Sequence, residues 1–136
     1  MRFDLEAEVA GYIEAQHFTG LYFPEGEGGR EPTPLDENDH SSFDKIPAYL
    51  CLQMRREMKQ FLEILEWGLS EEELDFLEEI LSEPGHIGHN FSLTKNHHGT
   101  GFWDRGLGEL GDKITELAQT FSEGGLYKDG DGWELE

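Results

Sequence analysis

The chain has 136 residues, and its 30 acidic residues against 10 Lys and Arg give a formal net charge of −20. A field of that sign repels phosphate backbones and anionic lipids, so we expect neither direct nucleic-acid binding nor membrane binding. The single cysteine excludes an intramolecular disulfide and a thiolate zinc cluster.

The length predicts a single domain over residues 1–136, with a core supplied largely by aromatic side chains. The N-terminal segment is acidic where a secretory leader would be basic and then apolar, which predicts a cytoplasmic location. Asp4 is placed to cap a first helix, and apolar residues at helical spacing carry that helix to about Gln16. Three prolines, three glycines and seven acids then predict a long, flexible acidic loop over residues 24–44.

Two further helices are predicted in the middle of the chain. Apolar residues recur at helical spacing over residues 50–67, and Pro47 suits the first turn of this helix. Ser70 with Glu73 has the pattern of a capping box, in which each side chain binds a backbone amide of the other residue. This pattern predicts a third helix over residues 70–83.

The periodicity changes after that helix. Apolar and small or polar residues alternate over residues 87–94, which predicts a strand with one face buried. A turn at residues 96–99 would let residues 100–103 pair back as the second strand of a hairpin.

The C-terminal segment predicts one more helix and one more hairpin. Asp104 is a candidate cap for a strongly amphipathic helix over residues 107–121. Residues 126–128 and 133–135 then flank a turn rich in Asp and Gly, as in a β-hairpin. The predicted fold is therefore α+β, with about four helices packed on a small antiparallel sheet of two β-hairpins.

One group of side chains near the first predicted hairpin has the chemistry of a hydrolytic site. Its members are His89, His98, Asp104 and Arg105. Three protein ligands and a water make a hydrolytic zinc or iron site, and His89 and His98 are the candidate metal ligands. The structural alternative makes His89 a hydrogen-bonded core residue and Asp104 a helix cap. A small metal-dependent or acid–base hydrolase is thus one candidate function.

The distribution of acids points to a different candidate. No Lys or Arg occurs between Lys59 and Lys95, an interval that holds nine carboxylates. The predicted helix over residues 70–83 is about 20 Å long, so its seven acids give roughly one charge per 3 Å, against ~3.4 Å along one strand of B-DNA. The candidate partner-binding carboxylates are Glu63, Glu66, Glu71, Glu72, Asp75, Glu78 and Glu79. The alternative is that they only form a solvated surface.

The residues between 88 and 108 also resemble a known signature. The segments HNF, LTKN and HGTGFWDRGLG in this stretch are similar to GHDFWLTRNGHGAGFWDRG, the signature of a family of small bacteriophage-encoded proteins. The signature itself aligns with Gly88 to Gly106, and a looser likeness continues to about Leu135. This chain departs from the signature at Asn90, Ser92, Lys95, His97 and Thr100. The resemblance implies a phage origin and transfers no active site.

Charge and resemblance together favour an acidic inhibitor that works without a cofactor in the cytoplasm of the bacterial host. The expected partner is a host protein with a basic nucleic-acid-binding surface, which the inhibitor would occupy as a DNA mimic of the anti-restriction or anti-CRISPR type. The metal-dependent or acid–base hydrolase is the alternative, and a homodimer is compatible with either function.

Overall fold

The computed structural model describes residues 2–23, 32–37, 41–97, 99–130 and 132–135. These residues contain five α-helices, which are α1 (Leu5–Thr19), α2 (Ala48–Gly68), α3 (Glu71–Ile80), α4 (His86–Lys95) and α5 (Glu109–Ala118). They also contain the strands β1 (Leu21–Phe23), β2 (Thr33–Pro34), β3 (Leu126–Asp129) and β4 (Gly132–Leu135). Short 3-10 turns occur at η1 (Leu35–Glu37), η3 (Phe43–Lys45) and η4 (Phe102–Asp104).

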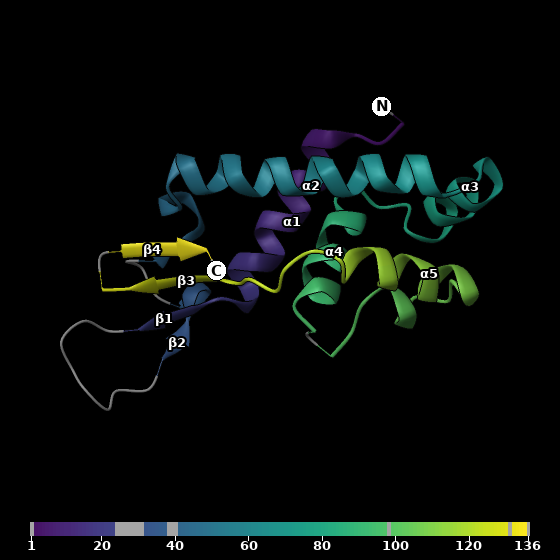
Figure 1. The fold of residues 1–136 in the computed structure, drawn as a ribbon. Coiled ribbons are helices and arrows are strands. Elements are labelled where there is room, and N and C mark those ends of the chain that lie inside the picture. Colours follow the sequence, from purple (N-terminus) through teal and green to yellow (C-terminus); the bar gives the residue numbers. More distant parts are fainter. Residues whose placement is uncertain (1, 24–31, 38–40, 98, 131, 136) are drawn as a thin grey trace.

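The protein is α+β, as the sequence predicts, but the sheet is mixed and not antiparallel throughout. The strand order is β2-β1-β3-β4, in which β1 and β3 are parallel and the two outer pairs are antiparallel. Figure 1 shows the sheet beside the N-terminal half of α2, with α3 and α5 toward the other end of that helix. The predicted C-terminal hairpin is confirmed as β3 and β4.

Two of the predicted helix starts are confirmed by their caps. Asp4 accepts a hydrogen bond of 3.2 Å from the backbone amide of Ala7 at the start of α1. Ser70 and Glu73 form the reciprocal capping box of α3, with bonds of 2.9 and 3.1 Å. Each cap satisfies amides that have no partner within the helix, which is why a local sequence pattern was enough to locate these starts.

The prediction of a strand over residues 87–94 is wrong, because this segment is helix α4. Most of α4 is buried, including the small or polar residues Gly88, Asn90 and Ser92 that suggested a solvent-facing side. A helix buried on most sides has no polar face, so its sequence lacks the 3.6-residue period that identifies amphipathic helices.

The second half of the predicted first hairpin is also wrong, because residues 102–104 form a 3-10 turn and not a strand. Phe102 begins the 3-10 turn η4, where its fully buried ring packs 5.9 Å from that of Phe61. Asp104 lies in this turn and does not cap the last helix, since α5 begins at Glu109 after Gly108. Gly108 has a φ of +62°, a backbone conformation that glycine adopts without steric cost.

Part of the predicted acidic loop is ordered into the fold. Within residues 24–44, Thr33 and Pro34 form β2, and the side chain of Leu35 is fully buried. The amide of Leu35 donates a 3.1 Å hydrogen bond to the carbonyl of Gly20. Residues 24–31 and 38–40, on which the predicted flexibility also rests, lie outside the described residues.

The core is built around aromatic rings contributed by helices α2 and α4. Phe61 on α2 stacks on Phe91 of α4 with ring centroids 4.2 Å apart, and Phe121 meets both rings edge to face. Such rings bury large apolar areas, so a modest number of them can supply most of the core. Among the described residues, no helix combines the length and apolarity needed to cross a lipid bilayer.

Candidate functional site

The predicted partner-binding carboxylates lie on α3 and on the last turns of α2. The side chains of Glu71, Glu72 and Glu79 are exposed on α3, and they make no ion pair within the described part of the chain. On α2, Glu63 is exposed and its carboxylate lies 4.0 Å from the ammonium group of Lys59, at the limit of an ion pair. These four carboxylates are therefore available to an external cation.

The other three predicted carboxylates converge on Arg2, a residue that the sequence analysis did not connect with them. The guanidinium donates to Glu78 at 2.9 and 3.1 Å and also to Asp75. The backbone amide of Arg2 donates to Glu66 at 2.6 Å. The bonds to Glu78 and Asp75 raise the pKa of Arg2 above its already high ordinary value, so this side chain stays cationic. The N-terminal arm thus partly neutralises this acidic surface.

A second cation, Lys113 of α5, pairs with a carboxylate of α3. Lys113 donates to the carboxylate of Glu73 at 3.2 and 3.3 Å. The backbone amide of Ser70 and the Lys113 ammonium both lower the pKa of Glu73, with the amide making the larger contribution. The pair is largely solvent-exposed, so it adds little to the free energy of unfolding. It nevertheless links α3 with α5.

An apolar groove lies between α2 and α5, next to these acids. Its volume is about 590 Å³, and it is lined by Gln60, Glu63, Ile64, Trp67, Gly68, Leu117 and Phe121. Trp67 is 93% exposed, although it ends the apolar stripe that predicted α2. No pattern in the sequence predicts this groove, because the apolar stripe of a helix does not reveal which of its members stay uncovered.

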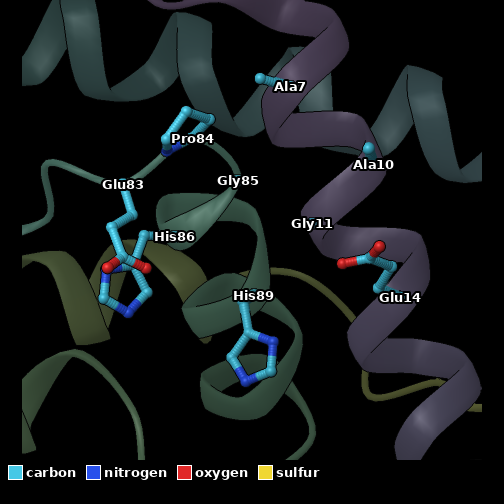
Figure 2. Close-up of a pocket in the computed structure, with 9 residues that line it drawn as sticks. All are labelled: Ala7, Ala10, Gly11, Glu14, Glu83, Pro84, Gly85, His86 and His89. Atoms are coloured by element: carbon cyan, nitrogen blue, oxygen red, sulfur yellow. The ribbon is translucent and has the colours of Figure 1, made fainter.

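A hollow lined by both polar and apolar residues lies between α1 and α4, as Figure 2 shows. His86 and His89 project from α4, and Glu14 projects from α1 toward them. The Nδ1 atom of His86 is buried and has no hydrogen-bond partner among the described residues. A second hollow shares Glu14 and His89 and continues toward Asp36 and Phe43. The two hollows together form a depression along α1, here called the histidine hollow.

The electrostatic surroundings favour the neutral form of His89. Partial burial lowers the pKa of His89, and the nearby His86 and Arg105 lower it further, while Glu14 acts in the opposite direction. The imidazole of His89 is therefore uncharged at neutral pH and can accept a proton. The side chain of His89 is half-buried and lines both parts of the histidine hollow, so a small molecule in the hollow can reach it.

The structure brings together only part of the predicted hydrolytic site. Arg105 lies close enough to His89 to influence its pKa, but its Nε donates at 2.7 Å to the buried side chain of Asn90. Asp104 is exposed on η4, and His98 lies outside the described residues. Within the described chain, no group of three or more His, Cys, Asp and Glu side chains is arranged to hold a metal ion.

A buried polar network around Lys95 was not predicted. The side chain of Lys95 is 2% exposed, and its ammonium donates to the carbonyls of Ser122 and Gly124 at 3.1 and 3.0 Å. Glu57 of α2 lies 3.4 Å away and also accepts from the hydroxyl of Tyr12. Burial lowers the pKa of Lys95, while Glu57 opposes that effect.

The residues of the phage-like signature mainly build the interior of the fold. Thr94 accepts from the amide of Phe102 at 3.2 Å, and Asn96 accepts from the amide of Gly124 at 2.9 Å. Together with Lys95, these side chains fix η4 and the segment that leads into β3. Comparisons of the chain with protein-family models, curated proteins and solved structures gave no match.

Proposed function

We propose that the protein is a non-enzymatic acidic inhibitor that binds the basic, nucleic-acid-binding surface of a host defence protein, such as a restriction or CRISPR nuclease. The observation that carries this proposal is the run of nine carboxylates without any Lys or Arg over residues 60–94. Its helical members Glu71, Glu72 and Glu79 are exposed and available to an external cation. The likeness to a phage family supports a partner in the bacterial host.

The pairing of Arg2 divides the acidic surface into two parts. Glu66 and Glu78 already bind the N-terminal arm, so they contribute less to an external partner than their number suggests. Asp75 also pairs with Arg2, yet its side chain is 71% exposed and can still face a partner. The leading contacts are therefore Glu71, Glu72, Asp75 and Glu79, with Glu63 beside them.

The test compares two charge-reversal triples that change the net charge equally. Glu71→Lys, Glu72→Lys and Glu79→Lys reverse α3, whereas Asp36→Lys, Glu37→Lys and Glu134→Lys reverse exposed acids on η1 and β4. Competition with duplex DNA for a panel of purified restriction and CRISPR nucleases is measured at low and high salt. We expect competition by the parent chain and the control triple, steep weakening with salt, and loss in the α3 triple. Equal loss in both triples, or salt-insensitive competition, would contradict the proposal.

The histidine hollow favours a second candidate function, acid–base hydrolysis. The supporting observation is a neutral imidazole at His89 beside the carboxylate of Glu14 in a solvent-accessible hollow. A histidine acting as a general base must be neutral at the working pH and within reach of a substrate proton. Hydrolysis of ester and phosphodiester substrates that disappears in His89→Ala and persists in His97→Ala would favour this function.

Metal analysis tests a metal-dependent form of the hydrolase. The metal-dependent hydrolase requires His89 and His98 as metal ligands. His98 lies outside the described residues, and the described residues alone form no metal-binding group. Metal analysis of the purified protein would then find stoichiometric zinc, iron or manganese that is lost when His89 and His98 are changed to Ala. Metal-free protein would exclude the metal-dependent form, and undiminished DNA competition by that protein would favour the inhibitor.

A further inference from the structure

The acidic surface alone does not explain the groove between α2 and α5. Ile64, Leu117 and Phe121 form its apolar lining, and the indole of Trp67 stands beside it almost fully exposed. An exposed tryptophan next to a concave apolar surface is characteristic of a protein-binding site, because Trp contributes much of the affinity at interfaces once it is covered. Among the described residues that line the groove, Glu63 alone is charged.

The charges around the groove specify what can cover it. Residues 60–83 and 109–121, which supply α3 and both walls of the groove, contain twelve acids and one base. That base is Lys113, which already pairs with Glu73. A second copy of this chain would bring two such acidic surfaces together, and the repulsion opposes that dimer. A cationic partner is attracted by the same field.

The shape of the groove favours a helix as the occupant. Helices α2 and α5 contact one another, as Figure 1 also shows, and the groove is lined by Gln60 to Gly68 of α2 on one side and by Leu117 and Phe121 on the other. The lining residues of α2 recur at positions 60, 63, 64 and 67, which is the spacing of one face of a helix. The apolar side chains of an added helix, spaced in the same way, fit between such rows.

We propose that this groove binds a basic amphipathic helix of the partner, whose apolar face contacts Trp67, Leu117 and Phe121 while its cationic face meets the acids of α2 and α3. This inference rests on the proposed function, because it identifies the structural class of the partner's basic surface. The acids supply long-range attraction, and the groove supplies contacts that salt does not screen.

The test uses two synthetic peptides of identical Lys and Leu composition. One places Leu at i, i+3, i+4 and i+7 so that it forms an amphipathic helix, and the other distributes Leu around the helix. Binding is measured by calorimetry at low and high salt with the parent chain, Trp67→Ala and Leu52→Ala. Leu52 is the matched control, since it is an exposed apolar residue on the same helix but outside the groove.

We expect the amphipathic peptide to bind at least tenfold more tightly than its scrambled counterpart, and the preference to persist at high salt. Trp67→Ala should remove most of the preference and Leu52→Ala should leave it unchanged. Because Trp67 is 93% exposed, its replacement does not disturb the core. Tryptophan fluorescence that shifts on binding in the parent chain, but not in Trp67→Phe, would place the peptide at the groove.

The outcomes separate the inference from the function on which it rests. Equal binding of both peptides, unaffected by Trp67→Ala, would overturn the groove as a helix site and leave the acidic surface intact. Binding of neither peptide at low salt would overturn both. Concentration-dependent self-association that Trp67→Ala abolishes would show that a second copy occupies the groove, and would also overturn the inference.

Discussion

The carboxylate of Glu8 on α1 accepts a hydrogen bond of 3.0 Å from the backbone amide of Gly88 on α4. The amide of Gly85 donates to the same carboxylate at 3.3 Å. Glu8 therefore caps a helix that lies 77 or more positions away in the chain, and it does so from a buried position. This contact joins the N-terminal helix to α4.

Removing this carboxylate should destabilise the fold. Glu8→Ala leaves two buried amides of α4 without an acceptor, so we expect the free energy of unfolding to fall by about 1–3 kcal/mol. Glu14→Ala, on the same helix but exposed, should change it by less than about 0.5 kcal/mol. Urea denaturation followed by circular dichroism measures both variants, and equal effects would contradict the assigned role of Glu8.

The same residue predicts a pH dependence of stability. Burial raises the pKa of Glu8 above its ordinary value of 4.5, despite the opposing amides of Gly88 and Gly85. The folded chain thus holds this proton more tightly than the unfolded chain does. Stability contributed by the protonated form is present at acidic pH and is lost as the pH rises from 4.5 through the raised pKa. Unfolding free energies across this window should decline less steeply in Glu8→Gln, and parallel slopes would refute the assignment.

The buried ammonium group of Lys95 should matter more than an exposed one. Lys95→Met removes the donor to the carbonyls of Ser122 and Gly124 and leaves Glu57 without its cation. We expect a loss of about 3–5 kcal/mol, the range for breaking one member of a buried pair. Lys113→Met breaks an exposed pair and should cost less than about 1 kcal/mol. Thermal unfolding that ranks the two variants the other way would show that the Lys95 network is not structural.

The tight packing of α1 against α4 predicts an intolerance of side chains at Gly88. A Cβ at this position would lie 1.9 Å from the backbone carbonyl oxygen of Glu8, so Gly88→Ala must push the two helices apart. We expect a loss of more than about 2 kcal/mol, whereas Gly125→Ala, with open space around it, should be neutral within about 1 kcal/mol. A Gly88→Ala chain as stable as its Gly125→Ala control would disprove the close packing.

The N-terminal arm provides a prediction about binding. Arg2→Ala frees the carboxylates of Asp75 and Glu78, which makes the surface of α3 more negative. We expect the amphipathic basic peptide to bind roughly twofold to fivefold more tightly at low salt, with a steeper decline as salt rises. Arg56→Ala, which changes the net charge equally on an exposed side chain of α2, is the control. Equal gains in both variants would show that only net charge matters.

Local signals in the sequence were sufficient for some elements and not for others. The caps at Asp4 and Ser70 and the turn before Trp133 depend on neighbours within a few residues, so their helices and hairpin could be predicted. Helix α4 could not be predicted, because it packs against α1, α2 and α5, and this burial leaves it no polar face. Its alternating pattern therefore resembled a strand.

The candidate sites differ in the same way. The absence of Lys and Arg over residues 60–94 is a property of the sequence, and it predicted a negative surface before any fold was known. The convergence of Glu66, Asp75 and Glu78 on Arg2 depends on how the N-terminal arm returns to α3. Neither the histidine hollow nor the groove beside Trp67 has a local signature, since each is formed by two helices distant in the chain.

By itself, the sequence determined the net charge, the α+β class, the capped starts of α1 and α3 and the exclusion of an intramolecular disulfide. These properties follow from composition or from contacts within one turn. Only the tertiary structure decided that α4 is a buried helix, that Lys95 and Glu8 are interior polar residues, and that Trp67 stands uncovered beside a groove. The physical reason is that burial and pairing depend on which distant segments pack together, and a local sequence pattern does not determine that packing.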